Sequence, residues 1–430
     1  MGTQAVKLVN YLEERKTDIL AVLGLILLGY AFYNPALRLV PVDFDDLVLL
    51  SHVKNTSNPL NFFIQDWGFG NYGYRPLHSL SLWIGYQVFG VSSGPNQLVN
   101  IILHILVMVL LYIFLIRFQP LRYLAFTFSA LAMVSLYTFS PPTWISDRPT
   151  LFVCFFLVVN LLYLSSEKKK SILILLALSL LALMSKESGL VVPALSIIVL
   201  FLQDGFSKKN WGIFSTLGGL VLVYLVFRLI IFGASAGTYD EAGYLFGYRY
   251  YQNSAELSGF YRVIAPIENV IKNFIAVFLP VFNGQGKLSL IGTLSNTMVL
   301  GFTTVILTML AWKKKWDIYQ KVGIALIILN ALVHFQVFRY RTLYLAQVGW
   351  VIFLAASPAF VSASRRTLFA LLVSAVLALW NIHIIGEDLT YMILDRMQVI
   401  QSPDFRESIL ASSNRIDPGV VDRIIEKYKH

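Results

Sequence analysis

The sequence predicts an all-α polytopic membrane protein. Hydrophobic residues make up 57% of the 430 positions and charged residues only 13%, and the mean hydropathy is +0.67. A soluble domain carries roughly one-quarter charged residues. The apolar runs repeatedly reach about 18 to 22 residues, the length that a helix needs to cross a hydrocarbon core. They are too long, and alternate too little, for the strands of a membrane barrel.

The apolar runs predict about eleven membrane-spanning helices. The first covers Ile19 to Leu37 and is expected to stay attached, because it is too long for the core of a signal peptide and no small-residue cleavage site follows it. The other predicted spans cover residues 97–116, 121–140, 149–165, 170–184, 188–203, 211–232, 289–311, 319–337, 342–360 and 367–386.

Basic residues between the spans predict the orientation of the chain. They fall on one side of the predicted topology, and cytoplasmic loops carry an excess of Lys and Arg. The N-terminus is therefore expected in the cytoplasm and the C-terminal tail outside. This distribution also explains most of the net charge of +10, so we do not expect a nucleic-acid partner. The basic positions are Arg117, Arg122, Lys168–Lys170, Lys208, Lys209, Lys313–Lys315, Arg365 and Arg366.

Two shorter apolar segments are predicted to lie at the outer membrane surface rather than to cross. Residues 76–90 and 267–282 would reverse the charge pattern of later loops if they spanned, and Lys272 interrupts the second segment. The outer side then carries two large loops, 41–96 and 234–288. Tyrosines of the second loop favour a belt at the membrane interface over stacking on sugars. They are Tyr239, Tyr244, Tyr248, Tyr250 and Tyr251.

The tail, residues 387–430, is predicted to follow a membrane domain that covers residues 1–386. Ser402-Pro403 and Asp417-Pro418 each resemble an N-cap followed by proline at the first helical position, so two short helices are expected. An apolar stripe in the second helix favours docking on the membrane domain. Cys154 is the single cysteine, which excludes disulfides and thiol metal clusters.

Three acids follow the first span closely: Asp43, Asp45 and Asp46. They could form a hydrated loop end, or a site. Arg75, in the same outer loop, is a fixed cation whose planar fork suits phosphate. A carboxylate can accept the proton of an attacking hydroxyl while cations stabilise a departing phosphate. The pattern therefore favours group transfer from a lipid phosphate.

Further cations are expected at the outer ends of other helices. Each could be an ordinary snorkelling residue, but together they exceed what the positive-inside rule predicts for an outer face. A shared anion explains them more economically. They are Arg148, Lys186, Arg339 and Arg341.

Asn100 and His104 are spaced i, i+4 on one face of the second span. We predict an interhelical hydrogen bond there rather than a metal site, because no partner lies at ligand spacing. His78 is assigned a supporting role near the site. The sequence contains neither a phosphate-binding loop nor a dinucleotide fingerprint, so no nucleotide cofactor is expected.

These segments together resemble the GT-C glycosyltransferases, and most closely the branch of protein O-mannosyltransferase-like enzymes that includes transmembrane-and-tetratricopeptide-repeat mannosyltransferases and bacterial relatives. The resemblance covers roughly residues 15 to 390 and rests on the order and spacing of motifs that are individually weak. The motifs are "FDDLVLL", "YRPLHSLSLWIGYQVFG", "NQLVNIILH", "SKESGLVVP" and "RTLYLAQVG".

The resemblance implies a GT-C-type bundle in which Asp45 is the catalytic base and Asp46 its partner. The remaining family positions correspond to cations and one acid that hold the donor. Tyr340 replaces an acidic family residue, and no tetratricopeptide array follows, which leaves the sugar and the acceptor open. The donor positions are Arg75, Arg148, Lys186 with Glu187, and Arg341, while Asp43 is an additional acid of unassigned role.

The sequence as a whole predicts an inverting glycosyltransferase that uses a polyprenyl-phosphate sugar and a hydroxyl acceptor on a protein, glycan or lipid. It is expected to work on the outer face of a bacterial cytoplasmic membrane. A divalent metal is possible but not required, because the arginines could neutralise the phosphate. The alternatives are a flippase or transporter of lipid-linked sugars, which would place its charges nearer the middle of the membrane, and a polysaccharide ligase.

Overall fold

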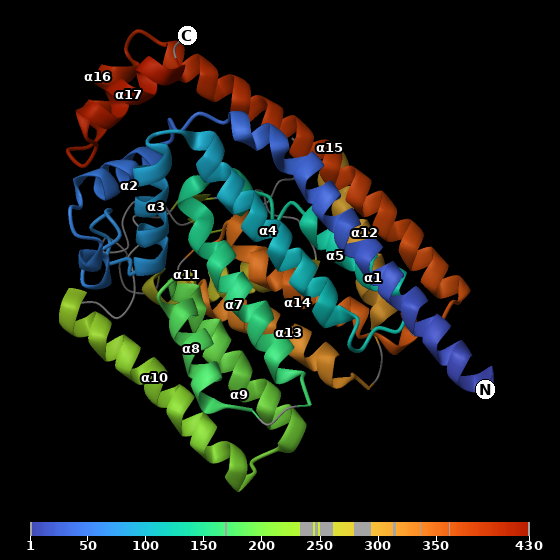
Figure 1. The fold of residues 1–430 in the computed structure, drawn as a ribbon. Helices are drawn as coiled ribbons and strands as arrows, with labels where there is room; N and C mark the ends of the chain where they lie inside the picture. The colour runs from blue at the N-terminus through green and yellow to red at the C-terminus, as the bar shows by residue number, and fades with distance from the viewer. Residues whose placement is uncertain are drawn as a thin grey trace.

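The structure is a computed structural model of the 430-residue chain. Most of the described residues lie in helices, which pack into one elongated bundle (Figure 1). The structure describes residues 2–167, 170–232, 244–245, 248–249, 261–278, 294–312, 315–335, 337–360 and 362–428.

The α-helices vary widely in length. In chain order they are α1 (Gly2–Tyr33), α2 (Phe44–Asn55), α3 (Pro76–Phe89), α4 (Ser93–Leu115), α5 (Arg122–Met133), α6 (Ser140–Thr143), α7 (Arg148–Leu164), α8 (Ile172–Leu183), α9 (Val191–Asp204), α10 (Lys208–Phe232), α11 (Tyr261–Phe278), α12 (Leu294–Ala311), α13 (Ile318–Val333), α14 (Tyr344–Ala355), α15 (Arg365–Gln401), α16 (Phe405–Ser412) and α17 (Pro418–Tyr428).

Short elements connect several of these helices. The 3-10 helices are η1 (Asn34–Arg38), η2 (Pro59–Phe63), η3 (Ile145–Asp147), η4 (Glu187–Leu190), η6 (Tyr340–Leu343) and η7 (Pro358–Phe360). Two two-residue strands, β1 (Tyr244–Leu245) and β2 (Tyr248–Arg249), pair antiparallel. The predicted tyrosine belt concerns side chains outside the described part of the chain.

Within the described residues, six helical segments are long and apolar enough to cross a membrane. The predicted class of a helical protein with membrane-crossing segments is therefore confirmed at that level. The count of eleven stays a prediction, because α5, α8 and α14 have 12 residues each. At 1.5 Å per residue such a helix is about 18 Å long, against a core of about 30 Å. The six segments are Arg15–Arg38, Ser93–Leu115, Ile145–Leu164, Glu187–Asp204, Asn210–Phe232 and Arg365–Gln401.

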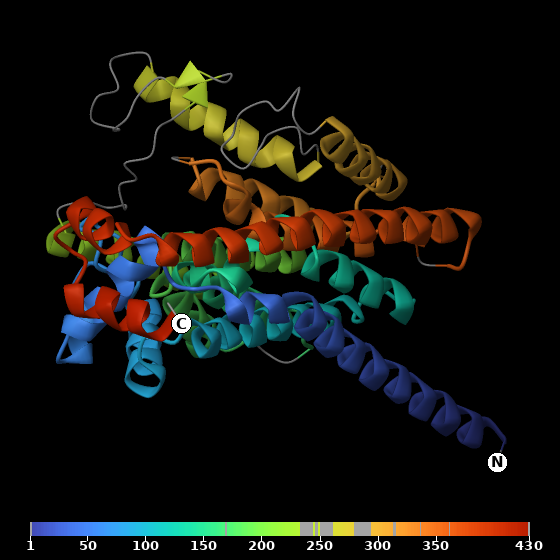
Figure 2. The same ribbon diagram turned by 90° about the horizontal axis from the view of Figure 1, so that it is seen from above.

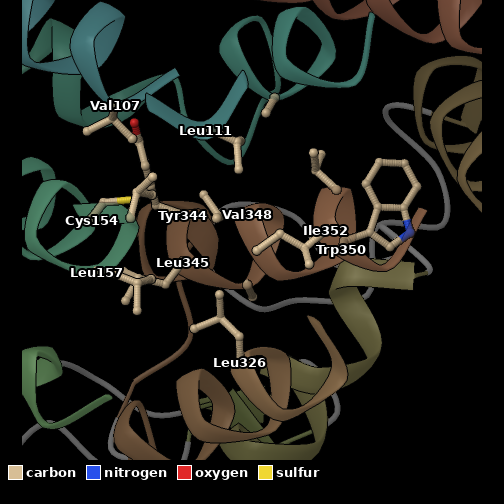
Figure 3. Close-up of a cluster of buried hydrophobic side chains, with 14 of the residues drawn as sticks. Val107, Leu111, Cys154, Leu157, Leu326, Tyr344, Leu345, Val348, Trp350 and Ile352 are labelled. Atoms are coloured by element: carbon tan, nitrogen blue, oxygen red, sulfur yellow. The ribbon is translucent and has the colours of Figure 1, made fainter. Parts of the chain in front are cut away.

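Helix α14 forms the centre of the hydrophobic core. Every residue from Tyr344 to Ala355 is buried, which agrees with a segment that is apolar on all sides. Its side chains meet those of α4, α7 and α13, including Leu111, Cys154 and Leu326 (Figure 3). The apolarity of the predicted span 342–360 thus reflects burial within protein on every side of this helix.

Helices α13 and α14 approach closely at a pair of glycines. A Cβ atom built on Gly349 would lie 2.7 Å from the carbonyl oxygen of Gly323, and one built on Gly323 would lie 2.5 Å from that of Gly349. Small residues permit such backbone contact between helices. This crossing positions η6, which directly precedes α14, against the rest of the bundle.

One end of the molecule gathers the segments that carry the candidate site. Helices α2, α3, α16 and α17 lie together there, away from the N-terminal end of α1 (Figures 1 and 2). Helix α3 begins at Pro76, as the sequence predicted for residues 76–90. Its position at a membrane surface stays a prediction.

The tail docks on this end through a separate apolar cluster. Val420, Val421 and Ile424 of α17 are fully buried and pack in a cluster that includes Leu47 and Val48 of α2. The expected docking is therefore confirmed, and α17 begins at Pro418 as predicted. Helix α16 begins three residues after Ser402 rather than directly after it.

Helix α15 differs from the expected boundary at residue 386. It runs without a break to Gln401, so the predicted membrane domain and tail meet inside one helix. The buried residues Leu389, Arg396 and Ile400 explain the continuation, because they keep one face of α15 packed against the protein beyond the apolar run. This extension brings a buried arginine to the end of the molecule that carries α2.

Helix α11 turns its polar face inward. Glu268 and Lys272 form an ion pair and both are buried, while Ile267 and Ile271 are about half exposed. The helix covers residues 267–278 of the segment predicted to lie in the outer leaflet. An apolar face that points outward is what contact with lipid would require.

Candidate functional site

A cavity of about 490 Å³ opens at the end of the molecule where α2 lies. Its walls come from α2, the loop before α3, η3, the turn before η4, the segment between α13 and η6, η6 itself and the C-terminal tail. We call it the cationic cavity, because basic side chains outnumber acidic ones in its lining. It is lined by Phe44, Asp45, Trp67, Phe69, Asn71, Arg75, Ser146, Asp147, Lys186, His334, Val337, Arg339, Arg341, Thr342, Ser413 and Arg415.

A second cavity of about 530 Å³ lies beside the first. The two share Phe44, Asp45, Arg339 and Arg341, so these residues form the boundary between them. We call it the side cavity. It is lined by Asp43, Phe44, Asp45, Phe139, Ser140, Thr143, Trp144, Arg339, Arg341, Met392, Asp395 and Arg396.

The first turn of α2 separates the three acids of the sequence motif. Asp43 is the N-cap of the helix, and Asp45 and Asp46 lie in its first turn, where the helix dipole favours negative charge. Successive positions on a helix face different directions. Asp45 is half-buried and lines both cavities, whereas Asp46 is fully buried and lines neither.

Asp46 lies against η3 and α15. Its Oδ1 accepts a hydrogen bond from the backbone N–H of Ser146 at 3.2 Å, and its Oδ2 lies 4.0 Å from Nη1 of Arg396. Burial raises the pKa of this carboxyl to about 7, although the Arg396 guanidinium acts in the opposite direction. Asp46 therefore supports the turn from inside the protein.

Arg396 is a buried cation that sequence analysis did not assign to the site. It forms an ion pair with Asp43 and donates a hydrogen bond to the carbonyl oxygen of Val40 at 3.1 Å. The structure thus places Asp43 against α15. The signal in the sequence was weak, because Arg396 lies far beyond the last apolar run.

Arg75 is held by a carboxylate and an aromatic ring. Its Nη2 lies 3.2 Å from Oε2 of Glu187, and its guanidinium lies 3.6 Å from the centre of the Trp67 ring. Oε1 of the same glutamate lies 3.6 Å from Nη1 of Arg228, a buried residue of α10 that sequence analysis missed. Glu187 thus orients a cation that lines the cavity.

Lys186 reaches the cavity from the turn between α8 and η4. Its Nζ donates a hydrogen bond to Oγ1 of Thr150 at 2.8 Å and lies 3.4 Å from Oδ1 of Asp147. Burial lowers the pKa of this amine, while the neighbouring carboxylate raises it. Asp147 also lines the cationic cavity, a position that sequence analysis left unassigned.

Arg341 of η6 and Arg339, the N-cap of that helix, lie at the boundary between the cavities. Arg341 lies with its guanidinium 4.4 Å from the centre of the Trp144 ring. Thr342 donates a hydrogen bond to Oδ1 of Asn273 at 2.9 Å, which ties η6 to α11. The predicted donor positions Arg75, Lys186, Arg339 and Arg341 are thus brought together around one cavity.

Arg148 lines neither cavity. Its guanidinium donates hydrogen bonds to Oδ1 of Asn100 at 2.6 Å, to Oγ of Ser81 at 2.7 Å and to the carbonyl oxygen of Asn96 at 2.9 Å. It is 1% exposed, and each of its three nitrogens donates one of these hydrogen bonds inside the protein. Arg148 therefore links α7, which carries it, to α3 and α4.

The other polar residues of the second predicted span also lie inside the bundle. Nδ1 of His104 lies 2.6 Å from the hydroxyl oxygen of Tyr344, and Nε2 lies 3.1 Å from the carbonyl oxygen of Met133, so the predicted interhelical hydrogen bond is confirmed.

His78 of α3 is fully buried, and among the described residues neither ring nitrogen has a hydrogen-bond partner. Burial, reinforced by neighbouring cations, lowers the pKa of His78 well below its usual value.

Arg415 enters the cationic cavity from the tail. Sequence analysis assigned it no role, because it lies far along the chain from the other cations and no motif connects it with them.

Within the described part of the chain, no group of three or more His, Cys, Asp and Glu side chains has an arrangement suited to a metal ion. That a divalent metal is possible but not required stays a prediction.

The cavities therefore bring one half-buried carboxylate, Asp45, beside a set of fixed cations. Such an arrangement can bind an anionic group and accept a proton next to it. The resemblance to GT-C enzymes stays a prediction from the sequence motifs. Comparisons of the chain with protein-family models, with curated proteins and with solved structures find no match.

Proposed function

We propose that this chain is an inverting glycosyltransferase that moves a sugar from a polyprenyl-phosphate donor to a hydroxyl acceptor. One observation carries the proposal: Asp45 lines the same cavity as five cations that come from four separate parts of the chain. They are Arg75, Lys186, Arg339, Arg341 and Arg415.

The chemistry needs a base and an anion site close together. The acceptor oxygen would form a bond to the anomeric carbon as the bond from that carbon to the phosphate oxygen breaks. Asp45 would take the proton of the acceptor hydroxyl, and the released polyprenyl phosphate would be stabilised by the cations of the cavity. Displacement from the side opposite the phosphate inverts the anomeric centre.

The residues at the boundary between the cavities suit these two roles, the binding of the phosphate and the deprotonation of the acceptor. Asp45, Arg339 and Arg341 line both the cationic cavity and the side cavity. In the proposal the phosphate occupies the cationic cavity and the acceptor hydroxyl approaches from the side cavity. Arg75, fixed by Glu187 and Trp67, offers a planar fork for a phosphate oxygen pair.

The proposal includes a membrane setting. Six helical segments within the described part of the chain are long and apolar enough to cross a membrane, and a polyprenyl chain needs a bilayer. We place the reaction on the outer face of a bacterial cytoplasmic membrane, with the N-terminus in the cytoplasm, because the basic loop residues favour that orientation.

A donor screen tests the proposed function. Purified protein in lipid nanodiscs receives a panel of labelled polyprenyl-phosphate sugars with candidate acceptors, and released polyprenyl phosphate is measured. We expect Asp45→Asn to lower turnover by about 100-fold or more, since general-base catalysis contributes about that much. The control is Glu407→Gln, which changes an exposed carboxylate of α16 that lines neither cavity. Wild-type turnover in Asp45→Asn would remove Asp45 as the base.

The same materials distinguish transport from transfer. In sealed vesicles a flippase would move the labelled lipid across the bilayer without releasing polyprenyl phosphate. If Asp45→Asn moves it at the wild-type rate and neither protein releases polyprenyl phosphate, the chain is a transporter. A polysaccharide ligase would instead release the lipid phosphate only when a glycan acceptor is present.

A further inference from the structure

A third cavity, of about 390 Å³, lies beside α2. It is formed by the second half of α2, the loop around η2 and the turn between α16 and α17. We call it the polar cavity. It is lined by Val48, His52, Asn55, Thr56, Ser57, Asn61, Gln65, Gly68, Asn414 and Arg415.

The lining is rich in neutral hydrogen-bonding groups. Four carboxamides, those of Asn55, Asn61, Gln65 and Asn414, face it together with two hydroxyls. A carboxamide both donates and accepts, as a sugar hydroxyl does. The lining contains no carboxylate and a single guanidinium, so its chemistry matches a neutral, polyhydroxylated ligand better than a metal ion or a polyanion.

His52 adds an unsatisfied polar atom to this wall. Its Nε2 is buried, and among the described residues it has no hydrogen-bond partner. Burial lowers the pKa of His52, although the nearby Asp66 carboxylate acts in the opposite direction. Buried polar atoms are normally paired, so this nitrogen calls for a partner from outside the protein, either a ligand group or water.

The loop that walls the cavity is held in a defined shape. Oδ1 of Asp66 accepts hydrogen bonds from the backbone N–H groups of Gly68 at 2.8 Å and Gly70 at 2.7 Å. Gly68 has a φ of +110°, and a Cβ there would lie 2.9 Å from Cβ of His52. The glycine therefore permits the close contact that places His52 on the wall.

The tail wall is fixed by contacts of Asp417. Its Oδ1 lies 2.6 Å from Nζ of Lys54, and its backbone N–H donates to Oγ of Ser51 at 2.9 Å. These contacts fix the turn that carries Asn414 and Arg415 beside α2. The polar cavity is thus built from segments that lie more than 300 residues apart in the sequence.

Arg415 joins this cavity to the cationic cavity, because it lines both. Its guanidinium lies against Gly70, where a Cβ atom would collide with it. A ligand that passes this arginine would therefore contact both sets of walls. One continuous substrate with a charged part and a neutral polar part fits the pair of cavities.

We propose that the polar cavity is a saccharide-binding subsite for the glycan part of a substrate that extends past Arg415 from the cationic cavity. The assignment of that glycan to a substrate rests on the proposed function, but saccharide binding itself does not. A peptide fits less well, because Val48 is the one apolar side chain in the lining, and helices and turns present no open strand edge there.

The test is direct binding. The labelled full chain in lipid nanodiscs, free of sugar-based detergents that would compete, is applied to a printed array of neutral oligosaccharides and of peptides that contain Ser and Thr. We expect retention on a subset of the oligosaccharides. The double variant Asn61→Ala with Gln65→Ala should bind those about ten-fold or more weakly, because it loses at least two hydrogen bonds.

Matched variants keep this result interpretable. Asn414→Ala changes the opposite wall and should also weaken binding, which covers the case in which the loop variant unfolds. Gln87→Ala, an exposed carboxamide of α3 that lines neither cavity, should bind as the wild type does. Retention of peptides only, no retention of any oligosaccharide, or equal binding by all variants would overturn the proposal.

The source of the glycan is resolved by competition. A free oligosaccharide from the bound subset and its polyprenyl-phosphate-linked form are compared as competitors. Stronger competition by the lipid-linked form assigns the subsite to the donor, and equal competition assigns it to the acceptor. Asp45→Asn should bind the array normally, so loss of transfer chemistry and loss of this subsite are separate outcomes.

Discussion

At the residue scale, Asp46 is the most constrained acid of the site. It is fully buried, and burial raises its pKa to about 7 despite the nearby Arg396. An aspartate in an unfolded chain has a pKa of about 3.9. The fold therefore favours the protonated carboxyl, and this stabilising contribution is lost as the pH rises from about 4 through about 7.

We predict that Asp46→Asn removes this pH dependence. The wild type should lose up to about 4 kcal/mol of unfolding free energy between pH 4 and pH 8 through the ionisation of Asp46. The variant should not show this loss, because its neutral amide cannot ionise. The measurement is thermal unfolding in nanodiscs across that range. Asp395→Asn, which changes an exposed carboxyl, serves as the control. Parallel pH profiles for wild type and Asp46→Asn would contradict the assignment.

A substitution of Arg396, the cation that faces Asp43 and Asp46, gives a second test of these contacts. Arg396 is 5% exposed and faces both acids, so Arg396→Gln leaves the buried Asp46 and the partly exposed Asp43 without their cation. Breaking a buried pair from one side costs about 3 kcal/mol or more. We expect a lower melting temperature at pH 8 and a smaller loss at pH 5, where Asp46 is protonated. A pH-independent loss would show that Arg396 does not act through Asp46.

Sequence reasoning located the charged residues better than it located their partners. Asp45, Arg75, Lys186 and Arg341 could be singled out because charge in an apolar chain is conspicuous. The partners Glu187 with Arg228, and Asp43 with Arg396, depend on which helices pack together, which local pattern does not reveal. Arg148 carries the same charge as the cavity residues, yet packing directs it to Asn100 instead.

At the element scale, apolar length predicted helices more reliably than spans. The expected span 97–116 corresponds to α4, Ser93–Leu115, and 211–232 lies within α10, Lys208–Phe232. The expected span 121–140 differs, because α5 ends at Met133. An apolar sequence indicates that a helix is shielded from water, but it does not show whether lipid or protein surrounds the helix. A helix buried in the bundle, such as α14, is therefore predicted as a membrane span.

The glycine crossing of α13 and α14 gives an element-scale prediction. Gly349→Ala would place a Cβ atom 2.7 Å from the carbonyl oxygen of Gly323, so the helices must move apart. Overpacking of this kind costs about 1 to 3 kcal/mol. We expect a lower melting temperature and, under the proposed function, lower turnover, because α14 positions η6 with Arg339 and Arg341.

The control for this crossing is a glycine in a similar helix with open surroundings. A Cβ atom on Gly212 of α10 would meet nothing within 4 Å. Gly212→Ala should therefore leave stability unchanged or raise it slightly, because alanine is the better helix former. Equal destabilisation by both variants would mean that the close crossing does not explain the effect at Gly349.

At the scale of the whole molecule, the tail forms a docked lid on one end of the bundle. Its apolar cluster, around Val420 and Ile424, is separate from the core around α14. Two clusters of this kind can open independently, since local opening follows the number of buried contacts in each unit. The tail nevertheless supplies Arg415 to the cationic cavity, so docking and site assembly are linked.

Asp417→Asn tests that linkage. The ion pair between Asp417 and Lys54 is only partly exposed, at 18% and 23%, and is worth about 1 kcal/mol. We expect hydrogen exchange of residues 402–428 to accelerate by about five-fold while the melting temperature of the bundle stays constant. Asp422→Asn is the matched control, because Asp422 pairs with Arg406 inside the tail and both are about half exposed.

The two variants together separate docking from tail folding. Asp422→Asn alters a contact within the tail and should leave its exchange close to wild type, since exposed pairs contribute little. If Asp417→Asn opens the tail, it should also weaken donor binding under the proposed function, because Arg415 leaves the cavity with the turn that carries it. Rapid exchange with unchanged donor binding would show that Arg415 contributes nothing to the anion site, and the cavity would then depend on Arg75, Lys186, Arg339 and Arg341 alone.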